Sequence, residues 1–177
     1  MPKAAVGGIE LYYETYGDGP PLLLVPGLGG VGSYWRPQID ALSEQFKVIV
    51  HDHRGTGRST RSEITYSVDQ MTSDLLILMD ALGIEQAHLV GHSTGAAIGQ
   101  TMAIERPDRV DRLVLYAGWT SCDPFMRRVF ETRKTLLEHY HLLHMSERIR
   151  PWCGARSLKV EARTECSPGT RQNDYSR

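Results

Sequence analysis

The chain has 177 residues, of which 41% are hydrophobic, and a formal net charge of −1. That length suits one domain with a sizeable core, and the near-neutral charge gives no electrostatic reason to expect nucleic acid or an anionic membrane as a partner. No apolar run is long enough to span a bilayer, and residues 1–8 lack the apolar core of a signal peptide. Three cysteines form neither a disulfide framework nor a metal-ligand pattern. We therefore expect a soluble cytoplasmic protein with reduced thiols.

Strand-like and helix-like segments alternate along the chain. Strands are marked by β-forming or unbroken apolar runs, and helices by apolar residues spaced three and four apart. Ser67 should cap the helix that follows it, Gly83 should end that helix, and Pro107 should stop the next one. The predicted elements, in chain order, are a strand at 9–16, a strand at 22–25, a helix at 34–46, a strand at 47–52, a helix at 68–82, a strand at 87–92, a helix at 94–105, a strand at 112–118 and a helix at 124–145.

This order predicts an α/β fold. The later strands, including 112–118, are continuous and apolar rather than alternating, which is typical of a parallel sheet buried under helices on both faces. Sites in such sheets lie beyond the carboxyl ends of the strands. The loops at Pro26, Asp52, Gly91 and Ala117 are therefore expected to meet at one edge.

The composition changes towards the C-terminal end. Residues 146–177 hold seven Lys or Arg against four Asp or Glu, and their only large aliphatic residues are Ile149, Leu158 and Val160. Such a segment has little apolar area to offset the entropy of ordering it. We expect it to be poorly ordered and unable to supply another buried strand.

One serine stands between two glycines where the strand 87–92 ends. The segment 91–95, "GHSTG", fits the pattern G-x-S-x-G between a strand and a helix. The chain must reverse there and hold the serine in strained geometry with its hydroxyl exposed, and flanking glycines have no Cβ to clash with it. The pattern predicts Ser93 as a nucleophile, with the Thr94 N–H at the helix start facing the oxyanion of a tetrahedral intermediate. The alternative is a tight turn with a buried serine.

A second N–H donor is expected from the glycine-rich loop 26–30, "PGLGG". An oxyanion hole uses two donors, and losing one typically costs ~10²–10³ in rate. The Leu28 N–H is the candidate. A flexible glycine turn is the alternative, whereas a phosphate-binding loop lacks both the dinucleotide spacing and the P-loop lysine.

The segment "DHRGTGRS" is expected to form a tight loop. His51 and His53 flank Asp52, but a metal site would need a further ligand converging from elsewhere, so no metal is predicted. Arg54 should pair with backbone or a carboxylate. His92 is expected to be structural or to line a pocket rather than to act as the base, because adjacent residues at a turn point in different directions.

Several motifs together resemble the N-terminal half of an α/β-hydrolase. They are "PGLGG", "DHRGTGRS", "VGHSTGAAIG" and "PDRVDRLVLYAG". Three further segments are similar to aminoacrylate or carbamate hydrolases of pyrimidine catabolism. They are "GLGGVGSYWRPQ", "YSVDQM", and "GW" followed by "RRVFETRKTLLEHY". "GHSTGAAIGQ" and "DHRGTGRS" are similar to 3-oxoadipate enol-lactonases. The resemblance covers roughly residues 9–140.

The resemblance implies a mostly parallel sheet flanked by helices, with a hydrolase core at 1–120, the start of a helical cap at 121–145 and a separate tail at 146–177. It implies hydrolysis of a small carbonyl compound without a cofactor. Ser93 matches the nucleophile, and Leu28 and Thr94 match the oxyanion-hole donors. Substrate contacts are expected from Gly27, Trp35, His92 and Trp119, although buried tryptophans more often belong to the core.

The family's pattern also requires an acid and then a histidine after the serine. No histidine follows His144, and Asp123 is the only carboxylate near a strand end after Ser93. We therefore expect a shortened chain, through a reading-frame shift near Tyr140 or as a natural short relative. The missing strands would expose a sheet edge, which a homodimer could cover. Two functions follow: a serine hydrolase acting on a small molecule, or a non-catalytic remnant that keeps a binding cleft.

Overall fold

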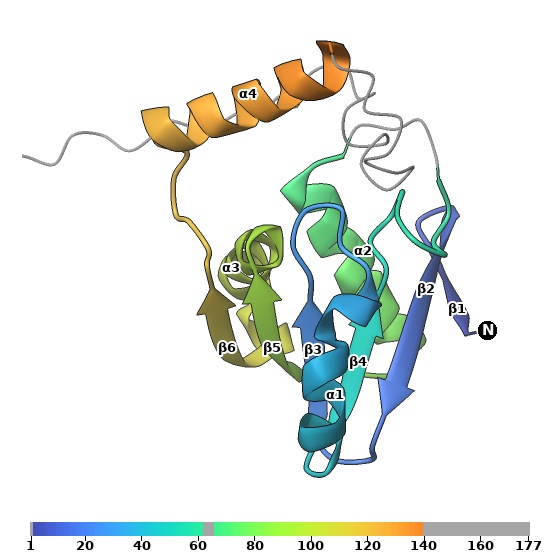
Figure 1. Ribbon diagram of the computed structural model, residues 1–177. Coiled ribbons are helices and arrows are strands. Elements are labelled where there is room, and N and C mark those ends of the chain that lie inside the picture. The colour runs from blue at the N-terminus through green and yellow to red at the C-terminus, as the bar shows by residue number, and fades with distance from the viewer. Residues whose placement is uncertain (1, 62–65, 140–177) are drawn as a thin grey trace, which may run out of the picture.

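The computed structural model describes residues 2–61 and 66–139 (Figure 1). It contains a six-stranded sheet with the strand order β1-β2-β4-β3-β5-β6. Strands β3, β4, β5 and β6 pair in parallel. At one side of the sheet, β2 pairs antiparallel with β4, and β1 pairs antiparallel with β2. This confirms the expected α/β fold with a mostly parallel sheet. The elements are β1 (Lys3–Val6), β2 (Ile9–Tyr16), β3 (Pro21–Val25), a 3₁₀ turn (Gly32–Trp35), α1 (Arg36–Ser43), β4 (Lys47–His51), α2 (Val68–Ala81), β5 (Ala87–His92), α3 (Thr94–Glu105), a second 3₁₀ turn (Pro107–Arg109), β6 (Val110–Tyr116) and α4 (Pro124–His139).

Helices cover the sheet on both faces, with α1 on one face and α2 and α3 on the other (Figure 1). Strand β3 shows how the sequence produces these layers. Leu22 and Leu24 pack into a core under α1, while Leu23 and Val25 pack into the larger core under α2 and α3. Because successive side chains of a strand point to opposite faces, an unbroken apolar run fills both cores. No helix in the described part of the chain is both long and apolar enough to cross a membrane.

Local sequence signals fix several element boundaries. The bounds of β2, β5 and α3 agree with those predicted. The Ser67 side chain accepts a hydrogen bond of 3.0 Å from the Gln70 N–H, which is the predicted cap of α2. Gly83 follows that helix with φ +66°, a conformation that favours glycine.

The helix predicted at 34–46 is shorter and begins differently. Its first residues form a 3₁₀ turn, and the regular helix α1 begins at Arg36 with Pro37 in its first turn. Proline fits there because the first turn leaves its N–H unpaired in any case. At the other end, the Leu42 carbonyl accepts bonds from the Gln45 and Phe46 amides, which closes the helix before 46.

Strand β1 is an element that the sequence patterns did not predict. It pairs with β2 through Val6 and Ile9, so that Gly7 and Gly8 form the two-residue turn of a hairpin. Both glycines have positive φ, at +52° and +84°. A Gly-Gly pair before a β-forming run is a hairpin signal, and it was available in the sequence.

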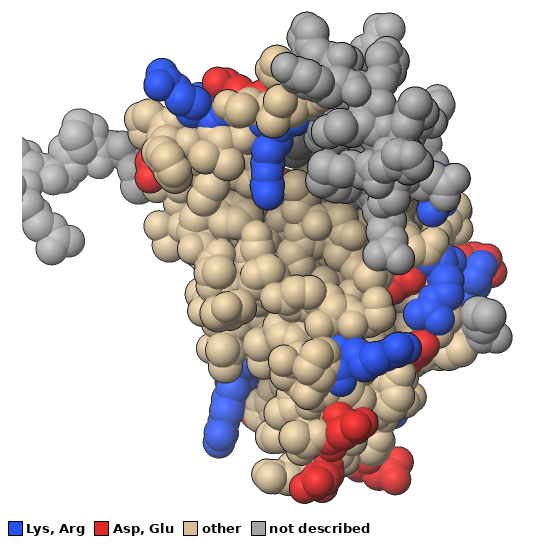
Figure 2. All heavy atoms as spheres, in the orientation of Figure 1, with Lys and Arg blue, Asp and Glu red and all other residues tan. Residues whose placement is uncertain are grey.

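The expectation that the strand 112–118 is buried is wrong. Strand β6 lies two residues earlier, and Val114, Leu115 and Tyr116 are 55%, 44% and 59% exposed. In the described part of the chain, β6 is the edge of the sheet and pairs only with β5. The surface over β5 and β6 in Figure 2 is mostly uncharged. An apolar strand is buried only if further elements cover it, and the sequence of the strand alone does not say whether they do.

Helix α4 begins where predicted and lies beyond the carboxyl ends of the parallel strands (Figure 1). The rest of the helix predicted at 124–145, the tail 146–177 and the proposed break near Tyr140 lie outside the described residues.

Candidate active site

Ser93 lies at the junction between β5 and α3. Its backbone has φ +55° and ψ −115°, a conformation that costs a non-glycine residue roughly 1–3 kcal/mol and persists only where the surroundings impose it. Two hydrogen bonds do so: the Ser93 N–H donates to the Tyr116 carbonyl at 2.9 Å, and the Ser93 carbonyl accepts from the Ala96 N–H at 2.9 Å. Ser93 is half-buried. Its backbone is thus held by β6 on one side and by the first turn of α3 on the other.

Glycines allow this junction to pack closely. A Cβ on Gly95 would lie inside 3 Å of the Val25 carbonyl oxygen, and a Cβ on Gly91 would lie equally close to the Gly95 carbonyl. A Cβ on Gly27 would lie 3.1 Å from the Ser93 Cβ and 3.2 Å from His92 Nδ1. The end of β3, the loop 26–30 and the Ser93 turn therefore touch through backbone atoms.

Two backbone amides flank this junction without an acceptor among the described residues. Within the described residues, neither the Leu28 nor the Thr94 N–H donates a hydrogen bond. The Leu28 side chain is 38% exposed, while Thr94 is buried at the first residue of α3. Unpaired amides at a helix N-terminus and in a loop are donors ready for an anionic oxygen.

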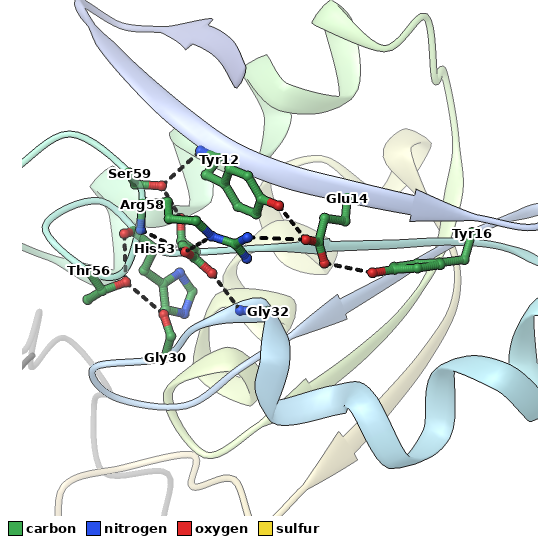
Figure 3. Close-up of polar contacts among 10 residues, drawn as sticks. Tyr12, Glu14, Tyr16, Gly30, Gly32, His53, Thr56, Arg58 and Ser59 are labelled. Carbon is green, nitrogen blue, oxygen red and sulfur yellow. Dashed lines mark hydrogen bonds and ion pairs between the residues drawn. The ribbon is translucent and has the colours of Figure 1, made fainter. Parts of the chain in front are cut away.

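The loop 52–59 holds the loop 26–30 in place. The His53 Nε2 lies 2.9 Å from the Pro26 carbonyl oxygen, and the Thr56 hydroxyl donates to the Gly30 carbonyl at 2.7 Å. The Gly32 N–H donates to Asp52 Oδ1 at 2.8 Å (Figure 3). Both loops were expected at one edge of the sheet, but these contacts were not predicted, because residues 20 to 27 apart in sequence form them.

The loop 52–59 is itself bound to β2. Asp52 Oδ2 accepts the Arg58 N–H at 2.8 Å, and the Arg58 guanidinium lies over the Tyr12 ring and 3.3 Å from Glu14 (Figure 3). Tyr12 and Tyr16 both donate to the Glu14 carboxylate. Burial alone would raise the Glu14 pKa, but these hydroxyls and Arg58 outweigh it and lower that pKa. Burial and the bond to Glu14 raise the pKa of Tyr12 to about 12.

The expectation that Arg54 pairs with a carboxylate is confirmed. Its Nε and Nη2 donate to the two carboxylate oxygens of Asp74 on α2, and both side chains are buried. Burial lowers the pKa of His51 well below its usual value, helped by His53, and burial lowers the pKa of His53 as well. Both histidines are therefore neutral at pH 7. Among the described residues no cluster of three or more His, Cys, Asp or Glu could hold a metal ion.

His92 lies between two tyrosines. Its ring stacks on Tyr34 at 4.9 Å and meets Tyr116 at 5.2 Å, and its buried Nδ1 has no hydrogen-bond partner among the described residues. Trp35 belongs to the core under α1, with its ring edge against Tyr34. Trp119 is half-buried, and its ring lies 6.1 Å from Phe130 of α4.

The candidate acid Asp123 caps a helix. Its Oδ1 accepts the Met126 N–H at 2.7 Å and its carbonyl accepts the Arg127 N–H at 3.0 Å, so it begins α4. Within the described residues, no histidine hydrogen-bonds Ser93 or Asp123. The structure thus brings together Gly27, Ser93 and His92, and it shows Asp123 in a capping contact.

A surface hollow of about 530 Å³ lies at the opposite end of the sheet, before β5 and β6. Arg109 in its wall donates to Asp80 and to the carbonyls of Ile84 and Glu85. The Arg109 guanidinium is therefore already paired, and no Ser, Thr or Cys is among the residues that line the hollow.

Comparisons with known proteins agree with the fold. The family model described as "alpha/beta hydrolase fold" matches residues 20–137. A protein of Azorhizobium caulinodans named "Putative carbamate hydrolase RutD" is 46% identical over 137 residues, covering 77% of this chain and 52% of that protein. One of the same name from Caulobacter sp. strain K31 is 40% identical over 173 residues, covering 92% and 64%.

A solved structure gives the same result. The crystal structure of the enol-lactonase from Burkholderia xenovorans LB400 matches with a TM-score of 0.71 and 32% identity, covering 85% of this chain and 58% of that one. The chain therefore spans between about half and two thirds of the length of the relatives it matches. The resemblance stated from the sequence motifs is confirmed, and the chain belongs to the alpha/beta hydrolase fold family.

Proposed function

We propose that the chain carries the nucleophile and the oxyanion-binding half of an active site that hydrolyses a small carbonyl compound. Ser93 is the nucleophile, and the Leu28 and Thr94 amides are the oxyanion donors. The observation that carries the proposal is the strained Ser93 backbone beside two amides for which the described part of the chain holds no acceptor. Strain of this kind clusters at functional sites, where the surrounding structure stabilises it.

The chemistry follows from these positions. A general base, which the family's pattern supplies as a histidine, takes the Ser93 hydroxyl proton while Oγ bonds to the carbonyl carbon. The C=O π pair moves onto the substrate oxygen, where the two amide donors, fixed before reaction, stabilise the negative charge. The helix dipole of α3 adds to this stabilisation at Thr94. The C=O bond re-forms as the leaving group departs with that proton, and water then releases the acyl group from Ser93. The relatives' names point to a carbamate or a lactone as the substrate class, and both contain the carbonyl that this arrangement would polarise.

A second candidate function is favoured by one observation. Within the described residues no histidine hydrogen-bonds Ser93. A serine hydroxyl without a base is a poor nucleophile at neutral pH, and losing one triad member costs about 10⁴–10⁶ in turnover. In this second function the chain binds small carbonyl or acid compounds at Ser93 and the two amides without turning them over.

A boronic acid tests the proposed site without requiring turnover. Phenylboronic acid should bond to Ser93 Oγ and place a boronate oxygen against the two amides, giving a tetrahedral ¹¹B NMR signal. The Ser93→Ala variant should lose this signal. Ser73→Ala, which removes an exposed α2 hydroxyl, is the matched control and should keep it. An equal tetrahedral signal in wild type and Ser93→Ala would refute the proposal.

An ester assay separates the two candidate functions. Hydrolysis of 4-nitrophenyl acetate by the wild-type chain should be faster than hydrolysis by Ser93→Ala, because only the wild type forms an acyl-serine. If both rates are equal while boronate binding still depends on Ser93, the non-catalytic function is the correct one.

A further inference from the structure

Two buried histidines lie behind the loop 26–30 and contact no substrate in the proposed mechanism. His51 Nε2 lies 3.2 Å from His53 Nδ1, and His53 Nε2 lies 2.9 Å from the Pro26 carbonyl oxygen. The two side chains are at most 3% exposed. They therefore form a continuous hydrogen-bonded row from β4 to the loop that carries Leu28.

The bonding partners determine the tautomers. A carbonyl oxygen only accepts, so His53 Nε2 must carry a proton. Neutral His53 then has a bare Nδ1, which accepts the proton on His51 Nε2. This leaves His51 Nδ1 bare, and that atom is buried with no hydrogen-bond partner among the described residues. Both rings are thus assigned the Nε2–H tautomer from their partners.

The row fixes the loop at one end, and Thr56 fixes it at the other. The Gly30 carbonyl accepts from the Thr56 hydroxyl at 2.7 Å and from the His53 N–H at 3.2 Å. Only residues 27–29 lie between these anchors. The turn is tight, because a Cβ on Gly30 would lie 2.5 Å from the Gly27 carbonyl oxygen. The orientation of the Leu28 amide is consequently set by the Pro26 and Gly30 carbonyls.

We propose that His53, backed by His51, is a positioning residue that orients the Leu28 N–H for the oxyanion. The inference rests on the proposed function of Leu28 as a donor. His53 touches no reacting atom and acts through the Pro26 carbonyl. Burial lowers the His53 pKa, whereas the bond to the Pro26 carbonyl and the Asp74 and Asp52 carboxylates raise it, and burial dominates. The neutral ring required by the row is therefore the state present at pH 7.

Paired substitutions test the role of the donor. Glutamine can place an amide N–H where His53 Nε2 stands, whereas leucine has a similar size and no donor. We expect His53→Leu to raise the dissociation constant of phenylboronic acid about tenfold, which corresponds to one hydrogen bond, and His53→Gln to restore it to within about threefold. Thr72→Val, which removes a buried α2 hydroxyl bonded to the Val68 carbonyl, should leave the constant unchanged.

NMR of the wild-type chain keeps the inference testable if His53→Leu does not fold. Long-range ¹⁵N spectra of the wild-type chain should show a protonated Nε2 and a bare Nδ1 on both rings. The Leu28 amide signal of His53→Gln should stay at its wild-type position, and that of His53→Leu should shift if this variant folds. A protonated Nδ1 on His53, or equal boronate affinity in His53→Leu and wild type, would overturn the inference. Absence of any Ser93-dependent boronate signal would instead refute the proposed function, while the Leu28 amide signal would still report on positioning.

Discussion

Replacing Gly95 with alanine should lower the free energy of unfolding by about 3 kcal/mol. The added methyl group would lie inside 3 Å of the Val25 carbonyl and 2.7 Å from the Pro26 carbonyl. Both obstacles are backbone atoms at the end of the central strand β3, so neither can rotate away. Overpacking of this kind costs about 1–3 kcal/mol and occasionally more. Urea denaturation followed by circular dichroism measures the change.

Gly99 is the matched control because it lies in the same helix. A methyl group there would meet the ends of the Leu89 and Leu113 side chains, which can move. Alanine also gains about 0.8–1.0 kcal/mol over glycine in a helix interior. We therefore expect Gly99→Ala to stay within about 1 kcal/mol of the wild type. Similar losses in the Gly95 and Gly99 variants would show that the close contact with β3 is not the cause.

Among substitutions that remove a side-chain contact, Asp74→Ala should lower the free energy of unfolding the most. It leaves the Arg54 guanidinium buried, with side-chain exposure of 3%, and without its bidentate partner. Breaking a buried ion pair from one side costs about 3–5 kcal/mol, a large share of the roughly 5–15 kcal/mol that stabilises a typical domain. Urea denaturation followed by circular dichroism measures this loss of stability.

Two further variants identify the cause of that loss. The double variant Arg54→Met/Asp74→Leu removes both charges and should recover most of the stability, because apolar pairs often replace buried ion pairs without loss. Asp108→Ala breaks the solvent-exposed pair with Arg106 and should hardly change the midpoint. An Asp74→Ala midpoint equal to the wild-type value would contradict the role assigned to the pair.

Elements whose signals are local could be predicted from the amino-acid sequence. The unbroken apolar run of β3, the cap at Ser67 and the serine between two glycines each depend on residues within a few positions. For that reason the bounds of β2, β5 and α3 and the junction at Ser93 could be predicted. The family resemblance rests on the same short motifs, and residues 20–137 match the family model.

Which of these residues contact one another became known from the folded chain. Trp35 packs in the core, β6 is exposed at the edge of the described sheet, and Asp123 caps α4 rather than contacting a histidine. His53 reaches the Pro26 carbonyl across 27 positions of sequence. Such contacts depend on which strands lie side by side in the sheet, and hydrophobic periodicity within one segment carries no information about its neighbours.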